Sequence, residues 1–252
     1  MNSTANSTKV GTLGDLIGSV GASVHLPGPD DSRRARDVHT PKAAYVVNCR
    51  SVDEVRLVVT AARVRNLAAQ LDGVKISYLG FVDRYRAQPG DYANAAAAAN
   101  IPGSPGNPTR GCTLANCGNG RIDDAVENES ILAWHQLARA GFIIGSYDGI
   151  GAVPTPTNTP TNPFSGYLQI IYDNAYSDVA APTNALNIKT GGNIPSPVIA
   201  ELDRKIDDGL PETGALRFSA FGGSTPTCLT AAAPVQYNAA VDVKTCGASQ
   251  LQ

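Results

Sequence analysis

A stripe of apolar residues, spaced alternately by three and four positions, restricts the fold of this chain more than any other feature. Such spacing places the side chains along one side of an α-helix. Leu57 extends the stripe upstream, and its main run is Val64, Leu67, Leu71, Val74, Tyr78, Phe81 and Tyr85. The pattern predicts a helix of roughly 35 residues, about 50 Å long. A core helix of a globular domain fits the stripe, although so long a helix also needs an extended partner.

The composition changes abruptly at the predicted start of this helix. Ser51 is followed three positions later by Glu54, which is the form of a capping box. Residues 1–50 are rich in Ser, Asn, Gly and Pro, then in Arg and Asp, with no sustained period of 2 or 3.6. We therefore predict a poorly ordered or atypical segment over residues 1–50, and a long helix plus a globular head over residues 51–252.

Shorter elements are predicted beyond the long helix. A second helix is expected over residues 129–140, stopped by Gly141, and a third from Ser196 as its N-cap through Ile206, closed by Gly209. Segments 166–176, 215–221 and 235–243 are typical of strands, and short connections favour an antiparallel sheet. The expected class is α+β, with long loops.

The five cysteines favour an oxidising compartment. Cys112 and Cys117 are close in sequence, and Cys228 and Cys246 bracket a stretch typical of a strand or turn. We predict that each of these pairs forms a disulfide and that Cys49 stays free. A zinc site is disfavoured because neither spacing has the C-x2-C form of a zinc knuckle.

Charge and hydropathy limit the partners. The 20 basic and 22 acidic residues give a formal charge of −2, which provides no basic field for nucleic acid. No stretch approaches the roughly 20 apolar residues that span a bilayer. The first residues have neither the basic nor the apolar region of a secretory signal, so no export route is visible.

The histidines do not indicate an enzyme. A hydrolase needs a nucleophile, a base and an orienting group, whereas the chain has only His25, His39 and His135. His135 follows Trp134 on a predicted helix, and we interpret it as a structural or surface residue. No established catalytic or nucleotide-binding motif is present. We expect no catalytic activity and no cofactor.

Two acidic segments raise the question of calcium. Residues 118–124 fail the EF-hand spacing, since a cysteine and apolar residues stand where oxygen ligands belong. The second group is Asp203, Asp207 and Asp208. We favour a structural interpretation, in which Asp207 and Asp208 accept backbone N–H groups of the following turn; calcium is the weaker alternative.

Three segments, in this order, resemble parts of prepilin-like proteins. They are FVDRYRAQPGDYANA (81–95), ESILAWHQLARAGFI (129–143) and IAELDRKIDDGLPETGALR (199–217), followed by a late cysteine pair. Over about residues 62–246 the chain is similar to prepilin-like and pseudopilin proteins of the type IV pilus and type II secretion superfamily. The motif residues are Pro89, Gly90, Asp91, Trp134, Leu137, Gly141, Asp203, Lys205, Asp207, Asp208, Gly209 and Pro211.

This resemblance implies a long helix whose second half packs on a small antiparallel sheet and whose first half is a membrane anchor and filament core. The stripe at 64–85 fits the second half, but the anchor is not recognisable, so we expect membrane contact only if a true anchor precedes this head. The implied function is that of a minor pilin or pseudopilin, which acts by self-assembly.

The same resemblance implies partners and a location. The partners would be other copies or related pilins and the assembly platform of the envelope, in the bacterial cell envelope or an extracellular filament. The alternatives are an extracellular binding module, for example for carbohydrate, and, less favoured, a secreted hydrolase. The single Trp argues against a stacking platform for sugars.

The boundary predicted near Ser51 is testable by hydrogen exchange. Amides before about residue 48 should exchange fast, because their composition cannot offset the backbone entropy lost on ordering. Slow exchange across this segment would place the boundary elsewhere.

Overall fold

The computed structural model describes residues 23–25, 46–48, 51–103, 106–115, 117–240 and 243–252. The chain divides into two compact units, residues 1–63 and 64–252. One helix, α2 (Val52–Tyr85), has residues in both. Cys49, His39 and most of the segment predicted to be poorly ordered lie outside the described residues, so those expectations stay predictions.

In the first unit, β1 (Ser23–His25) pairs antiparallel with β2 (Val46–Asn48). His25, one of the three histidines, stands opposite Val46 in this pair. Helix α2 starts directly after Ser51, whose hydroxyl oxygen accepts a hydrogen bond from the Glu54 N–H at 3.2 Å. The predicted helix start is therefore confirmed.

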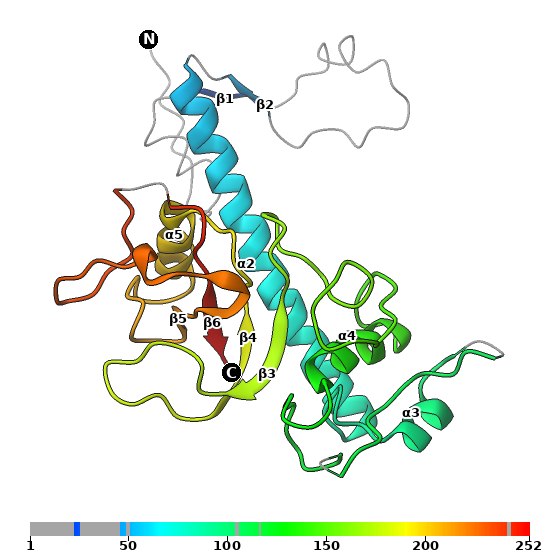
Figure 1. Ribbon diagram of the computed structural model, residues 1–252. Helices are drawn as coiled ribbons and strands as arrows, with labels where there is room; N and C mark the ends of the chain where they lie inside the picture. Colours follow the sequence, from blue (N-terminus) through cyan, green and yellow to red (C-terminus); the bar gives the residue numbers. More distant parts are fainter. Residues whose placement is uncertain (1–22, 26–45, 49–50, 104–105, 116, 241–242) are drawn as a thin grey trace, which may run out of the picture. The chain divides into compact units, whose positions relative to one another are not determined.

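The second unit contains a four-stranded antiparallel sheet in the order β3-β4-β6-β5 (Figure 1). The strands are β3 (Gln169–Asp173), β4 (Ala185–Lys189), β5 (Leu216–Phe218) and β6 (Ala248–Leu251). The other helices are α3 (Asn94–Asn100), α4 (Glu129–Arg139) and α5 (Ser196–Ile206), with short 3-10 turns η2 (Phe221–Gly223) and η3 (Pro226–Cys228). The chain is α+β, as predicted.

The apolar stripe of α2 forms part of the main core. Leu67, Leu71 and Phe81 are completely covered. They belong to one apolar cluster with residues of the sheet and of α5, among them Ile170, Ile188, Val198 and Ile199. In the part of the chain that the structure describes, no helix is both long enough and apolar enough to cross a membrane.

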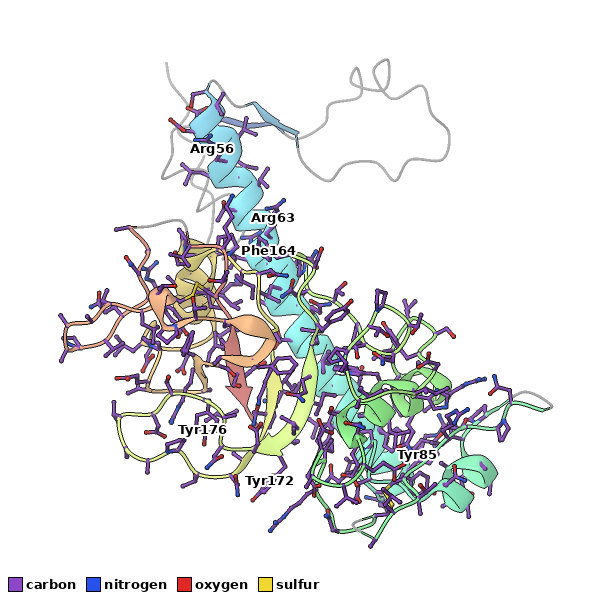
Figure 2. The ribbon with its side chains drawn as sticks, viewed as in Figure 1. Arg56, Arg63, Tyr85, Phe164, Tyr172 and Tyr176 are labelled. Carbon is purple, nitrogen blue, oxygen red and sulfur yellow. A yellow bond between two sulfur atoms is a disulfide. The ribbon has the colours of Figure 1, made fainter. Side chains whose placement is uncertain are left out.

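The two ends of the predicted stripe differ from its centre. Tyr85 (Figure 2) is only partly buried. The centre of its ring lies 4.6 Å from that of Phe81 and 5.9 Å from that of Tyr92. Leu57 lies on α2, as predicted, but its side chain is 44% exposed, so the buried part of the stripe does not extend to it. The continuous buried stripe begins instead at Ala61 and Val64.

The sheet differs from the prediction in one predicted segment and in two strands that were missed. Segments 166–176 and 215–221 contain β3 and β5, but the described part of 235–243, residues 235–240 and 243, forms no strand: Tyr237 makes only an isolated bridge with Leu229. The strands that were missed, β4 and β6, bury polar residues such as Asn187, Lys189 and Ser249. Buried polar residues hide the apolar–polar alternation on which strand prediction relies.

Helix ends follow the predicted signals with one correction. Gly141 has φ +80° just past α4, and the Phe142 N–H donates to the Leu137 carbonyl at 2.9 Å, which is a Schellman arrangement. For α5 the N-cap is Pro195, not Ser196. Ser196 is already helical, and its hydroxyl oxygen accepts the Val243 N–H at 3.3 Å.

Leu71→Asp should unfold the second unit or destabilise it by several kcal/mol, because it puts an unpaired charge in the fully covered part of the core. Ala69→Asp, on the exposed side of the same helix, is the matched control and should change the free energy of unfolding by less than about 1 kcal/mol. Urea unfolding followed by circular dichroism measures both. Equal effects would show that the stripe is not a core element.

Candidate functional site

Both predicted disulfides are present. Cys112 is joined to Cys117 and Cys228 to Cys246, each with a Cα–Cα distance of 5.6 Å. Cys228 ends η3, and Cys246 stands two residues before β6, so the second disulfide ties this turn to the sheet. The first lies against the start of α4, where Glu129 is next to the Cys112 sulfur.

Asp91 anchors the loop that follows the first disulfide. One carboxylate oxygen accepts the N–H groups of Gly118 and Asn119, and the other accepts that of Gly120 at 2.8 Å. Gly118 and Gly120 have φ of +76° and +81°, a conformation that glycine adopts without strain. Consecutive N–H groups turned toward one anion form a small anion-binding cradle. Here a side chain of the same protein occupies it.

Helix α4 holds the segment around Pro89 and Gly90 through one buried amide. The Gln136 side-chain oxygen accepts the Gly90 N–H at 2.7 Å, and its nitrogen donates to the carbonyls of Tyr92 and Arg110 at 3.2 and 3.1 Å. A Cβ at Gly90 would lie 2.2 Å from the Glu129 carbonyl oxygen, so only glycine fits. The sequence motifs did not single out Gln136.

His135 is a buried member of the same network. Its Nε2 accepts the Arg110 N–H at 3.0 Å, which leaves the proton on Nδ1, 2.5 Å from the Tyr147 carbonyl oxygen. Burial lowers the pKa of His135, and the nearby Arg139 and Arg110 lower it further. The ring is thus a neutral connector between two loops, in agreement with the structural interpretation.

Glu129 is the buried carboxyl group at the start of α4. Burial raises its pKa to about 8; the Asp123 N–H, 2.8 Å from its Oε2, acts in the opposite direction, and the charges of Asp91, Asp123 and Asp124 raise it further. Its Oε1 lies 3.3 Å from the Cys112 sulfur. Glu129 is therefore largely protonated at neutral pH.

The three aspartates after α5 organise the turn that follows them. Asp203 accepts the Gly209 N–H at 2.9 Å, and Asp207 accepts those of Ala215 and Leu216. Asp208 accepts the Leu210 N–H at 2.9 Å and the Thr213 hydroxyl. These hydrogen bonds agree with the structural interpretation of this motif.

Asp203 is completely buried, and burial raises its pKa to about 7. The Gly209 N–H and the Tyr237 hydroxyl act in the opposite direction, and the charges of Asp208 and Asp207 raise the pKa further. Burial likewise raises the pKa of Tyr237 well above its usual value. The carboxyl and the phenol thus form a buried polar pair.

Among the residues that the structure describes, two groups of side chains have ligand atoms within 4.8 Å of one another, as a metal site requires: Cys112 with Cys117 and Glu129, and the three aspartates. In the first group the sulfurs are joined to each other and offer no thiolate. In the second, all three carboxylates accept hydrogen bonds from the 209–216 turn. We assign a metal to neither group.

The remaining motif residues have structural places. Trp134 and Leu137 are in the core, and Pro211 is buried with its carbonyl accepting the Phe218 N–H at 2.8 Å. Lys205 is exposed on α5. The motif thus contains side chains that hydrogen-bond to neighbouring loops, residues of the core and one exposed lysine.

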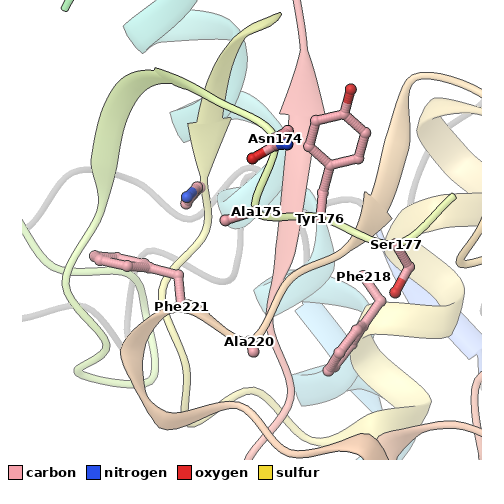
Figure 3. Close-up of a pocket in the computed structure, with 8 residues that line it drawn as sticks. Asn174, Ala175, Tyr176, Ser177, Phe218, Ala220 and Phe221 are labelled. Atoms are coloured by element: carbon pink, nitrogen blue, oxygen red, sulfur yellow. The ribbon is translucent and has the colours of Figure 1, made fainter. Parts of the chain in front are cut away.

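A pocket of about 510 Å³ lies beside the sheet (Figure 3). Its lining comes from the segment after β3, from β4 and from the end of β5: Asn174, Ala175, Tyr176, Ser177, Lys189, Phe218, Ala220 and Phe221. The Lys189 ammonium is buried, pairs with Asp173 and lies 5.5 Å from the centre of the Phe221 ring. Aromatic rings make this pocket mostly apolar, and the Lys189 ammonium is a buried cation at its wall.

No protein-family model, no curated protein and no solved structure matches this chain. The likeness to prepilin-like proteins therefore rests on the three sequence segments, and its functional consequences are proposals.

Asp203→Asn should make the stability of the protein less sensitive to alkaline pH. The folded state holds the Asp203 proton up to about pH 7, whereas the unfolded chain loses it near pH 4. Stability is therefore fully present below the unfolded pKa and falls as pH rises through the folded value.

The measurement is the melting temperature at pH 5 and pH 8.5. From pH 5 to pH 8.5 the melting temperature of the parent should fall, by an amount that corresponds to a loss of unfolding free energy on the order of a few kcal/mol. Glu129 contributes part of this loss, so the melting temperature of Asp203→Asn should fall less. Asp72→Asn, at an exposed position on α2, is the control. An unchanged pH dependence in Asp203→Asn would mean that Asp203 is ionised in the folded protein.

Proposed function

We propose that this protein is a structural subunit, a minor pilin or pseudopilin, of a bacterial type IV pilus-like or type II secretion filament. The observation that carries the proposal is that α2 is apolar on two sides. One side is buried in its own core, while the other presents Ile76 and Leu79, which are 69% and 53% exposed.

The surroundings of Ile76 suit the close approach of another helix. Gly73 and Ala69, one and two turns earlier, are exposed, and a Cβ added at Gly73 would meet no atom within 4 Å. Small residues next to large apolar ones allow two helices to pack closely. Burial of this face against a second copy would remove apolar area from water, worth roughly 25 cal/mol per Å².

The earlier part of α2 also exposes apolar side chains. Val52, Val55, Leu57 and Val59 are between 43% and 68% exposed. Exposed apolar residues scattered singly are ordinary, but a series along one helix marks an interaction surface. The partner that fits is a related helix with the same pattern, in another copy or a related pilin.

The motif residues support a structural role for the head. The motif residues Asp91 and Asp203, and the neighbouring Gln136 and His135, each accept a backbone N–H from a loop of the same chain. None of the four lines the pocket beside the sheet. Two disulfides suit the oxidising cell envelope or an extracellular filament, where the assembly platform would be a further partner.

The pocket beside the sheet supports a second candidate, an extracellular binding module. Phe218, Phe221 and Lys189 could hold a neutral apolar ligand that accepts one hydrogen bond, since Asp173 already balances the charge of the lysine. Trp134 is buried and offers no stacking surface for a sugar. Loss of ligand binding in Phe221→Ala, with self-assembly unaffected, would favour this candidate.

Ile76→Asp should reduce self-association by at least about tenfold while leaving the melting temperature nearly unchanged, because the side chain is exposed in the single chain. Val126→Asp is the matched control: Val126 is 58% exposed and lies outside α2. Sedimentation velocity over a concentration series, with electron microscopy of the assembled fraction, measures the effect. A parent chain that stays monomeric, or assembly that Ile76→Asp leaves intact, would contradict the proposal.

A further inference from the structure

The two cysteines of the first disulfide differ in accessibility. Cys112 is 2% exposed, whereas Cys117 is partly exposed. Thiol–disulfide exchange requires a thiolate to reach one sulfur in line with the bond that breaks. An incoming thiolate therefore reaches Cys117, and Cys112 is the sulfur that leaves.

The leaving sulfur has a carboxyl group beside it. Glu129 is completely covered, and its Oε1 lies 3.3 Å from the Cys112 sulfur. A disulfide sulfur carries no hydrogen, so a hydrogen bond across this contact has the carboxyl O–H as its donor. Among the groups that face Glu129 from the neighbouring loops are the Asp123 N–H and the carboxylates of Asp91, Asp123 and Asp124.

The nearby carboxylates limit how the Cys112–Cys117 bond can break. A thiolate formed at Cys112 would be buried among carboxylates and would be strongly disfavoured. A proton delivered as the sulfur leaves removes that obstacle. The high pKa of Glu129, about 8, keeps the proton available at neutral pH.

We propose that Cys112–Cys117 is a thiol–disulfide exchange site for dithiols, in which Glu129 passes a proton to Cys112 on reduction and removes it on oxidation. One thiolate of the dithiol attacks the Cys117 sulfur and forms a mixed disulfide. The electron pair of the broken bond goes to the Cys112 sulfur, which takes the Glu129 proton. The second thiol, after losing its proton to solvent, attacks its own partner sulfur and releases Cys117.

The balance is that of a two-electron exchange. The dithiol is oxidised to a disulfide, and Cys112 and Cys117 are reduced to thiols. Cys117 takes its proton from solvent, and the Glu129 carboxylate is then reprotonated.

The surrounding backbone allows the disulfide to open without unfolding the head. The Cys112 N–H donates to the Tyr92 carbonyl at 3.0 Å, and its carbonyl accepts the Asn94 N–H at 2.8 Å. On the other side of the disulfide, Asp91 holds Gly118. Both ends of the loop are thus held by hydrogen bonds that do not involve the sulfur atoms.

The second disulfide is a control within the same molecule. Cys228 and Cys246 are both completely buried, and the polar atom next to the Cys246 sulfur is the Val243 carbonyl oxygen at 3.7 Å. A carbonyl cannot deliver a proton. Cys228–Cys246 should therefore be reduced only when the chain unfolds.

The test uses the full folded chain with dithiothreitol from pH 6.5 to pH 9, after alkylation of any free thiol. Samples are quenched by a second alkylating agent, and each disulfide is followed by mass mapping. The rate, divided by the thiolate concentration, should be at least about 100-fold higher for Cys112–Cys117 than for Cys228–Cys246. For Cys112–Cys117 this normalised rate should fall about tenfold as pH rises through 8, because Glu129 loses its proton.

Glu129→Gln should be about tenfold slower at pH 7 and should lack the fall near pH 8. Glu127→Gln is the matched control: its Oε2 lies 3.9 Å from the Cys117 sulfur, and the fall near pH 8 should remain. Equal rates for the two disulfides, a flat profile in the parent, or a fall that persists in Glu129→Gln would each overturn the proposal. If Glu129→Gln does not fold, the pH profile of the parent is the test. Reduction of Cys228–Cys246 in the same samples then reports any unfolding.

Discussion

The burial of one side of α2 is the constraint on which the second unit depends. Leu67, Leu71 and Phe81 are completely covered and share one core with the sheet and α5. Burial of such a stripe stabilises the head by roughly 25 cal/mol per Å² of apolar area removed from water. The sheet itself is small, so a strand order that brings Ile170 and Ile188 onto the helix side follows from the need to cover the stripe.

The long loops are fixed by a different interaction, the acceptance of backbone N–H groups by buried or half-buried side chains. Asp91 and Asp207 each accept two or more backbone N–H groups, and Gln136 accepts one and donates to two backbone carbonyls. This satisfies N–H groups that no strand partner reaches. The arrangement costs some stability, because Glu129 and Asp203 are buried carboxyl groups with pKa values raised to about 8 and 7.

Local sequence signals predicted the elements that local interactions decide. The Ser51 cap, the stripe of α2, the ends of α4 and both cysteine pairs were all visible because their partners lie within a few turns or in a short loop. β4 and β6 were not visible, because Asn187 and Ser249 are buried and satisfied by a hydrogen bond across 62 residues. Gln136 was missed for the same reason: its partners lie 26 to 46 residues away.

The exposed face of α2 and the first disulfide are separated by α4. Glu129 begins this helix, and its other end is fixed to α2, where the Ser77 hydroxyl donates to the Phe142 carbonyl at 2.9 Å. Phe142 also packs over Gly80, where an added Cβ would lie 2.7 Å from its ring. The contacts that fix this end of α4 to α2 do not involve the cysteines, so we expect the exposed α2 face to stay in place when Cys112–Cys117 opens. The proposed self-assembly and the proposed thiol exchange can therefore be tested independently of each other.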